Sequence, residues 1–160
     1  MRNGRCVKEE KNNLTSVLCG ISGEYAAAAE LTRRGFVASI TLRNTRGIDI
    51  LVANADASKS AGVQVKTNQN GKRLWLLNRK AEDFHSENLY YVFVCLKPAG
   101  HRSDFFVVPS KDVAKYIKRS HARWLERPGR KGQAHKDNAM RQFKDPDGAY
   151  LERWELLELA

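Results

Sequence analysis

The sequence GIDILV at residues 47–52, followed after a polar loop by VQVKT at 63–67, constrains the fold of this chain most strongly. Both segments are rich in the aliphatic and β-branched residues of buried strands. Because side chains alternate along a strand, the two isoleucines and Val52 of the first segment share one face, and Asp49 lies on the other. Gln64 and Lys66 likewise lie opposite the two valines of the second segment.

If the two segments pair as a hairpin, the side chains of Asp49, Gln64 and Lys66 converge on one patch. A carboxylate, an amide and an ammonium group are costly to bury unless they are paired or bind an ion. The pattern therefore predicts a functional site. Two simpler interpretations remain open. Asp49 and Lys66 could form only a salt bridge across the hairpin, and Gln64 could be a solvent-facing strand residue.

The composition is that of a globular protein with a basic surface. The chain has 160 residues, of which 42% are hydrophobic and 29% are charged, so one domain with a substantial core is expected. The formal net charge is +10 and the isoelectric point is about 9.7. A balance of this size favours a polyanionic partner, nucleic acid first and an acidic membrane surface second. A basic surface that is merely solvated is the alternative.

The cysteines and histidines predict neither a disulfide framework nor a zinc site. Cys6, Cys19 and Cys95 are an odd number without C-x-x-C spacing, and Cys19 and Cys95 lie in apolar segments typical of core thiols. The four histidines have no metal-binding spacing and are expected on the surface or in loops: His85, His101, His121 and His135. No segment has the roughly 18 apolar residues of a membrane span, and 1–13 lacks the apolar run of a signal peptide, so we expect a cytoplasmic protein.

A helix is expected from about residue 14 to 34, with Gly35 ending it. Its apolar stripe is predicted to contain Val17, Ile21, Ala28 and Leu31, with Glu24 on the same seam. The glycines at 20 and 23 weaken the first half, so a start near Ser22 is an alternative. Glu24 could also be a carboxylate near the helix N-terminus, stabilised there by the helix dipole.

The remaining pattern predicts an α/β domain with a mixed sheet. Strands are expected at 36–42, around Asp49, around Gln64, and at 73–77, 89–96 (the central strand) and 105–108. After them we expect a helix from Lys111 to about Arg119 or beyond with Ser110 as N-cap, an exposed basic loop at 127–136, and a short helix at 150–159. The aromatic residues Trp75, Tyr90, Tyr91 and Phe93 are expected in the core. We divide the chain into a basic mobile arm at 1–13 and a single domain at 14–160, with a basic C-terminal extension from about residue 120.

An ordered set of short motifs resembles the PD-(D/E)xK nuclease superfamily. The motifs are Gly23-Glu24 opening a helix, Gly35 ending it, Gly47-Ile48-Asp49, and Gln64-Val65-Lys66-Thr67. This form is similar to archaeal Holliday-junction resolvases and to intron-encoded endonuclease-like proteins, and the resemblance covers about residues 20–110. It implies a restriction-endonuclease-like α/β core, a mixed central sheet flanked by helices, and divalent-metal-dependent hydrolysis of DNA phosphodiester bonds.

The resemblance also implies roles for four side chains. Asp49, Gln64 and Glu24 match the metal-binding positions, and Lys66 matches the lysine that orients or polarises the attacking water. Oxygen donors of this kind suit Mg²⁺ or Mn²⁺. The sequence departs from the family pattern in two places: Ile48 stands where proline is usual, and Gln64 replaces a carboxylate. The second departure keeps open a catalytically inactive DNA-binding module of the same fold within a larger assembly.

The partner implied by the resemblance is duplex or branched DNA, with no membrane contact. Thr67 could donate a hydrogen bond to a phosphate or could simply favour the strand. Clustered cations near the C-terminus are candidates for phosphate contacts: Arg119, Arg123, Arg127, Arg130, Lys131 and Lys136. A solvated loop is the alternative for them, and an unrelated protein meeting RNA, a ribosome or lipid is the alternative for the whole chain. Superfamily members with one site per chain often pair to cut both strands, so the resemblance is compatible with a homodimer.

Overall fold

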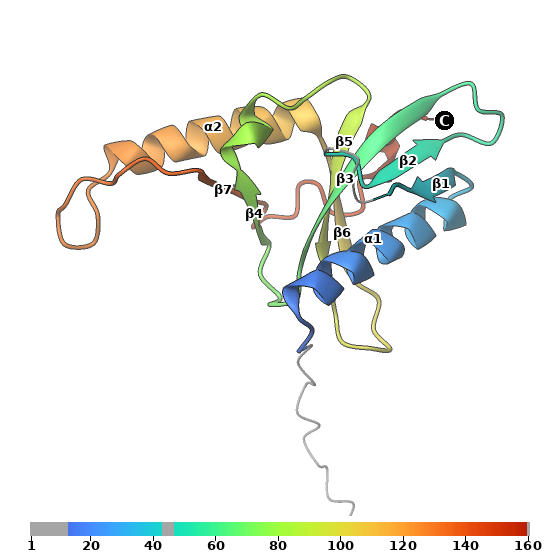
Figure 1. Cartoon of the computed structure of the whole chain (residues 1–160), viewed down its shortest axis with the longest axis horizontal. Helices are drawn as coiled ribbons and strands as arrows, with labels where there is room; N and C mark the ends of the chain where they lie inside the picture. Colours follow the sequence, from blue (N-terminus) through green and yellow to red (C-terminus); the bar gives the residue numbers. More distant parts are fainter. Residues whose placement is uncertain (1–12, 43–46, 160) are drawn as a thin grey trace, which may run out of the picture.

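The computed structural model describes residues 13–42 and 47–159, and it has a mixed α/β fold (Figure 1). In chain order the elements are α1 (Ser16–Arg33), β1 (Val37–Ile40), β2 (Ile50–Ala53), β3 (Ser60–Asn68), β4 (Leu74–Asn78), the 3-10 helix η1 (Arg79–Glu82), β5 (Leu89–Cys95), β6 (Asp104–Pro109), α2 (Ser110–Glu126), β7 (Met140–Lys144) and the 3-10 helix η2 (Trp154–Leu157). The predicted arm at 1–13 lies, apart from Asn13, outside the described residues.

The main sheet has five strands in the order β1-β2-β3-β5-β6. Strands β3 and β5 run parallel, and the other neighbouring pairs run antiparallel. Every residue of β5 is buried, as expected for a central strand. The predicted mixed sheet flanked by helices is therefore confirmed.

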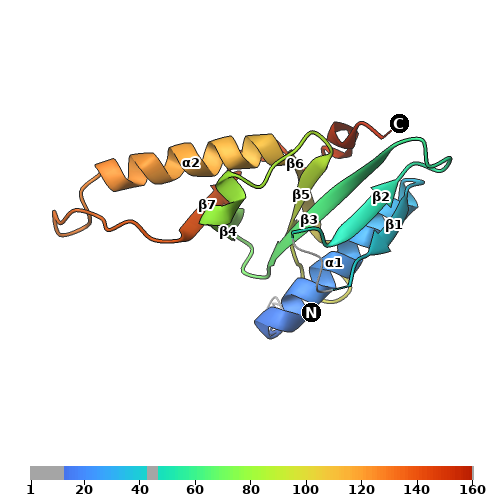
Figure 2. The ribbon, with the colours of Figure 1, turned by 45° about the horizontal axis from the view of Figure 1, so that its top comes forward.

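Two hydrophobic clusters fill the two faces of this sheet. On one face, Ala27 and Leu31 of α1 pack with the valines of β3. On the other, Val113 and Ile117 of α2 pack with aromatic residues that include Phe93 of β5. The sheet is thus the middle of three layers, and Figure 2 shows α1 and α2 on its opposite sides. This arrangement makes the end of the β2–β3 hairpin accessible beside α1.

Helix α1 begins at Ser16, so the alternative start near Ser22 is wrong. The Thr15 side chain accepts a hydrogen bond from the backbone N–H of Leu18 at 3.3 Å and caps the first turn. The predicted apolar stripe is confirmed at Leu31, which is fully buried, and at Ala28, which packs against the core, but it is wrong at Val17, which is 57% exposed. The buried face consists of Cys19, Gly23, Ala27, Glu30 and Leu31. Three of these residues, Cys19, Gly23 and Ala27, are small, which allows the helix to pack very close to the sheet.

Gly23 is the position of closest approach. A Cβ atom built on Gly23 would lie 1.8 Å from Oγ1 of Thr67 in β3, and all three side-chain heavy atoms of that threonine are within 3 Å. Only a residue without a side chain fits there. The contact sets the height of the helix above the sheet, and with it the position of the adjacent Glu24.

The strand predicted at 73–77 leaves the main sheet. As β4 it pairs antiparallel with β7, and the two form a separate ribbon with the register Leu74↔Lys144 to Asn78↔Met140. β7 lies in the part of the chain for which no element was expected. Its sequence MRQFK is short and contains two cations, and Arg141 is one of its two buried residues. That buried arginine concealed the alternation of inward and outward residues.

Helix α2 extends to Glu126, and Ser110 is its first residue rather than its N-cap. The Ser110 hydroxyl donates to the carbonyl of Ser86 at 2.9 Å and accepts from the Ser86 N–H at 3.1 Å. The side chain therefore fastens the helix to the segment before β5 instead of capping the helix. The cap position is occupied by Pro109, whose side chain makes no capping hydrogen bond.

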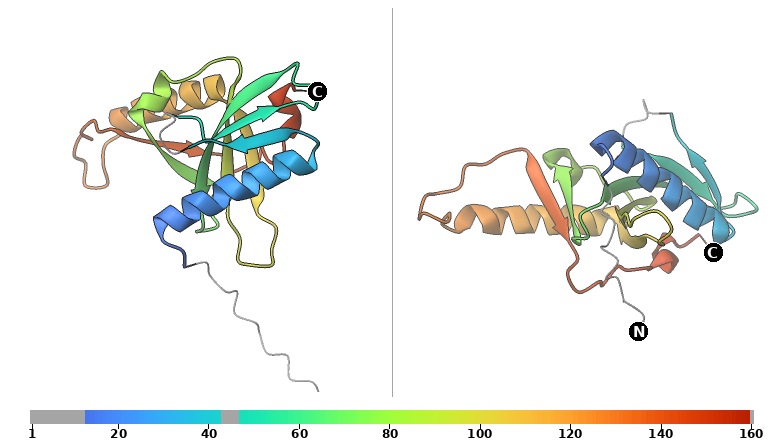
Figure 3. Two further views of the ribbon diagram at one scale, coloured as in Figure 1. Left: turned by 45° about the vertical axis from the view of Figure 1, so that its right-hand side comes forward. Right: turned by 90° about the horizontal axis from the view of Figure 1, so that it is seen from below.

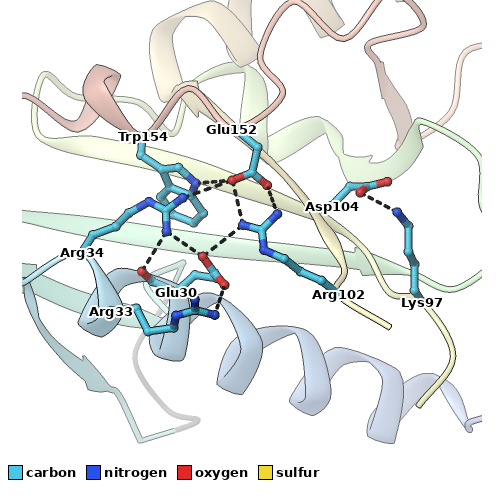
Figure 4. Close-up of polar contacts among 8 residues, drawn as sticks. All are labelled: Glu30, Arg33, Arg34, Lys97, Arg102, Asp104, Glu152 and Trp154. Carbon is cyan, nitrogen blue, oxygen red and sulfur yellow. Dashed lines mark hydrogen bonds and ion pairs between the residues drawn. The ribbon is translucent and has the colours of Figure 1, made fainter. Parts of the chain in front are cut away.

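The helix predicted at 150–159 is reduced to η2, and an ionic network holds this segment against α1 (Figure 4). Oε2 of Glu30 accepts hydrogen bonds from Arg34 at 2.6 Å and from Arg102 at 3.1 Å. Glu152 accepts from the same two arginines and, at 2.9 Å, from Nε1 of Trp154. Burial alone would raise the pKa values of Glu30 and Glu152, but the hydrogen bonds and positive charge of the arginines outweigh burial and lower both.

The core predictions for the cysteines and aromatic residues are confirmed. Cys19 and Cys95 are buried free thiols, and Cys6 lies outside the described residues. Trp75, Tyr90, Tyr91 and Phe93 are all buried. Among the helices of residues 13–42 and 47–159, none is long and apolar enough to cross a bilayer.

Candidate active site

Asp49 lies immediately before β2, where the β2–β3 hairpin opens. Strand pairing runs from Ile50↔Val63 to the turn of the hairpin, as the sequence predicted. The Asp49 N–H donates to the Val63 carbonyl at 2.8 Å, and its Oδ2 accepts from the N–H of Val65 at 2.7 Å. A carboxylate oxygen therefore takes the place of a backbone carbonyl in the ladder. This bond fixes the orientation of the Asp49 side chain at the end of the hairpin.

Gln64 and Lys66 flank Val65 on β3, and both are partly buried. Their neighbours in the parallel strand β5 are Tyr91 and Phe93, so these side chains share one face of the sheet. Burial and, to a lesser degree, the negative charge of Asp49 raise the pKa of Tyr91 to about 12. The negative charge of Asp49 therefore acts on Tyr91, which lies on the same face of the sheet as Gln64 and Lys66.

Glu24 and Asp49 line the same surface pocket, which has a volume of about 340 Å³. Its other lining residues come from the first turns of α1 and from Thr41: Ser16, Val17, Gly20 and Ile21 complete it. Oγ1 of Thr41 donates to the Ile48 carbonyl at 2.6 Å, which braces the segment that carries Asp49. The close packing at Gly23 brings Glu24 to the same pocket from the helix side. Two carboxylates from separate elements are therefore gathered at one opening.

The oxygen donors at this opening fit a hard divalent cation. Mg²⁺ and Mn²⁺ are bound through carboxylate and amide oxygens, which are the donors of Glu24, Asp49 and Gln64. Within residues 13–42 and 47–159, no group of three or more His, Cys, Asp or Glu side chains is arranged to hold a metal ion. The resemblance implies Gln64 as a third oxygen donor, but Gln64 is not among the residues that line the pocket of Glu24 and Asp49.

Thr67 lies beneath α1 rather than at the opening. Its Oγ1 is buried directly beneath Gly23 of the helix. The geometry therefore supports the alternative in which this threonine packs within the strand, and it gives the hydroxyl no route to a phosphate.

The predicted basic residues lie in a second region, between α2 and β7. Arg119, Arg123 and Arg127 line a pocket of about 400 Å³ there. Arg130, Lys131 and Lys136 are exposed on the following loop. The two pockets share no lining residue. The structure therefore gathers the first three arginines together but does not bring them to the pocket of Asp49.

Several residues of the second pocket were not anticipated from the sequence. Trp124 stacks on His121 and His135, with ring centroids 5.3 and 4.0 Å apart. Gln142 and Lys144 of β7, both exposed, also line this pocket. Alternation in the segment 140–144 was the available signal, and it was hidden by the short length of the strand.

Comparisons with known proteins point to one fold. No protein-family model matches the chain, and no curated protein matches it. A bacterial homing endonuclease of known structure, I-Ssp6803I, superposes with a TM-score of 0.52 over 90% of this chain and 92% of that protein. The two sequences are 15% identical. At this identity the similarity shows a shared nuclease-like fold, to which the residues of the pocket add their own chemistry.

Proposed function

We propose that this chain is a divalent-metal-dependent endonuclease that hydrolyses phosphodiester bonds in duplex or branched DNA, with a site of the PD-(D/E)xK type. The observation that carries the proposal is the pocket that joins Glu24 to Asp49, whose carboxylate accepts a hydrogen bond from the N–H of Val65, the residue between Gln64 and Lys66 on β3. The similarity in fold to a homing endonuclease supports it. The net charge of +10 supports a polyanionic substrate.

In this proposal the protein positions groups around one phosphate. Asp49, Glu24 and Gln64 would supply the oxygen ligands for Mg²⁺ or Mn²⁺. When bound, such an ion polarises a phosphoryl oxygen and lowers the pKa of a coordinated water. Nζ of Lys66 donates hydrogen bonds to the attacking water or to the non-bridging oxygens, where negative charge develops during the reaction. The Val65 N–H keeps the Asp49 carboxylate in place before the metal and substrate arrive.

The test is a cleavage assay on plasmid and four-way-junction DNA with Mg²⁺ or Mn²⁺, comparing the wild type with Asp49→Asn and Lys66→Met. The amide oxygen introduced by Asp49→Asn can still accept the Val65 hydrogen bond, so the fold is preserved while the charge is removed. Asp147→Asn is the matched control, because this aspartate is exposed in the loop after β7. We expect metal-dependent cleavage by the wild type and the control and its loss in both site variants. Wild-type cleavage rates in Asp49→Asn would exclude this site.

A second candidate function is DNA binding without cleavage. It is favoured by one feature, the neutral Gln64 at a position where a third carboxylate would hold the metal more strongly. Stable DNA binding by a wild-type protein that cuts neither substrate with either metal would establish this function instead. Cleavage gained on Gln64→Glu substitution would then show that the amide is the cause of inactivity.

In this proposal two copies of the chain pair as a homodimer, and each copy cuts one strand of the DNA. One proposed site per chain cuts one strand at a time, so a dimer is expected to linearise plasmid without accumulating the nicked form. Sedimentation of the protein on DNA, together with the order in which nicked and linear products appear, tests this stoichiometry.

A further inference from the structure

Among residues 13–42 and 47–159, the ribbon of β4 and β7 is covered on one face only. Trp75 and Leu77 of β4 and Phe143 of β7 point inward, where they pack with Ile117 of α2. In the right-hand view of Figure 3, seen from below, α2 lies behind the ribbon. The face of the ribbon away from α2 is turned toward the viewer, as is α1. The ribbon thus presents an uncovered surface on the side from which the Glu24 pocket is lined.

The uncovered face carries side chains suited to reading polar edges and methyl groups. Leu76 is 55% exposed and Met140 is 52% exposed, and Gln142 and Lys144 are exposed beside them. The six outward positions contain no carboxylate: Leu74, Leu76, Asn78, Met140, Gln142 and Lys144. Asn78 at the end of the ribbon uses its Oδ1 to cap η1 through the Lys80 N–H. A face with exposed apolar residues and no negative charge is complementary to a polyanion that also offers apolar contacts.

The same face continues into a cationic rim. Met140, Gln142 and Lys144 line the 400 Å³ pocket together with Arg119 and Arg123 of α2 and Arg127, which directly follows the helix. The arginines therefore lie beside β7. Cations in this position can neutralise phosphates that border a groove while the ribbon lies within it.

We propose that the outer face of the β4–β7 ribbon enters the major groove of duplex DNA and determines which sequence the endonuclease prefers. The major groove is about 12 Å wide and admits a two-stranded β-ribbon. Gln142 can bond an adenine edge through its carbonyl and amide, and Lys144 can donate to guanine O6 and N7. Leu76 and Met140 supply apolar contacts for thymine methyl groups. Arg119, Arg123 and Arg127 hold the adjoining phosphates.

This inference rests on the proposed function, since it takes DNA as the ligand, but its test does not depend on cleavage. Wild-type protein is mixed with a pool of randomised duplexes in Ca²⁺ or EDTA, and the bound sequences are selected and sequenced. The same selection is run on Gln142→Ala and Leu76→Ala. Val37→Ala is the matched control, because Val37 is 57% exposed on the edge strand β1, away from the ribbon. Arg123→Gln tests the rim.

We expect the wild type and Val37→Ala to select the same sequence. Gln142→Ala should lose about 5- to 150-fold of discrimination at one base pair, the range of a good bidentate contact, while its affinity for random duplex stays within about threefold. Arg123→Gln should weaken binding to all sequences alike and reduce the slope of log affinity against log salt by about one. Methylation of guanine N7 in the selected site should block wild-type binding, because N7 lies in the major groove.

Different failures have different meanings. If the wild type binds no DNA at all, the proposed function itself fails. If it binds without any sequence preference, or if Gln142→Ala and Leu76→Ala select the wild-type sequence, the ribbon does not read bases, and the endonuclease proposal stands unaffected. If the ribbon variants instead dissociate a dimer that the wild type forms without DNA, the face belongs to a second copy of the chain and the inference is overturned.

Discussion

Replacing Gly23 by alanine tests the close packing that places Glu24 beside Asp49. In the interior of a helix this substitution normally stabilises by about 1 kcal/mol, because glycine loses more backbone entropy on folding than alanine. At Gly23 the new methyl group would lie 1.8 Å from Oγ1 of Thr67, 2.8 Å from its Cβ and 2.9 Å from its Cγ2. Rotation of the threonine exchanges one close atom for another, so the helix must move away from β3.

The expected result is a net loss of stability. Overpacking of a filled site costs about 1–3 kcal/mol and sometimes more, which exceeds the gain in helix propensity. Gly20→Ala is the matched control, since a Cβ atom at Gly20 meets nothing within 4 Å in the same helix. We therefore expect Gly20→Ala to stabilise by up to about 1 kcal/mol. The two glycine variants should change stability in opposite directions.

Urea unfolding followed by circular dichroism measures both changes, and the double variant Gly23→Ala/Thr67→Gly separates the clash from other effects. Removing the threonine side chain eliminates all three short contacts, so the double variant should be more stable than the sum of the two single changes predicts. A Gly23→Ala protein as stable as Gly20→Ala, with no coupling to Thr67, would refute the proposed role of this contact. Cleavage by Gly23→Ala, measured well below its unfolding midpoint, should fall if the displaced Glu24 contributes to the site.

Three further predictions concern stability. Because the pKa values of Glu30 and Glu152 are lowered in the folded protein, their network stabilises the fold fully above the ordinary glutamate pKa of about 4.3, and this stabilisation is lost as the pH falls through the lowered values. Urea unfolding midpoints measured from neutral to acid pH should show the loss. Glu30→Gln should reduce the dependence of the midpoint on pH. Glu82→Ala should cost about 3 kcal/mol in urea unfolding, because the guanidinium of Arg141, whose side chain is 3% exposed, would lose the nearer of its two carboxylate partners and keep only Asp137 at 3.8 Å. Thr67→Val keeps the shape of the side chain and removes a buried hydroxyl, so thermal denaturation should show unchanged stability or a gain of up to about 1 kcal/mol.

The parts of the fold that the sequence predicted are those with strong local periodicity. The uninterrupted apolar run at 89–95 forms the buried central strand, and the alternation around Asp49 and Gln64 forms the hairpin whose register sets the site. These patterns are reliable because burial on one face of a strand fixes the position of every second residue. The helix beside them was placed correctly in its span, but its buried face was predicted only in part, at Leu31 and Ala28.

The errors arise where tertiary contacts override local pattern. The buried face of α1 was partly misassigned because Gly23 and Ala27 pack more closely than larger apolar residues, so a stripe of large residues such as Val17 is a poor guide there. The strand β7 was missed because Arg141 occupies a buried position through its pairing with Glu82. No periodicity rule anticipates an arginine at a core position, where Glu82, Asp137 and the carbonyls of Asn138 and Met140 together satisfy its guanidinium. The pocket lined by α2 and β7 was missed for the same reason.

The pairing of β4 with β7 also has a consequence for the order in which the protein is made. Leu74 pairs with Lys144, so β4 leaves the ribosome long before its partner strand has been synthesised. Until then the indole of Trp75 and the side chain of Leu77 have no Phe143 to pack against, although the central sheet has all of its strands once β6 is complete. Such distant pairings carry a large loop-closure entropy and form late. The β4–β7 ribbon should therefore fold after the main sheet, beside which Glu24 and Asp49 lie. A nascent chain halted after α2 should bind a chaperone through β4, which still lacks its partner strand.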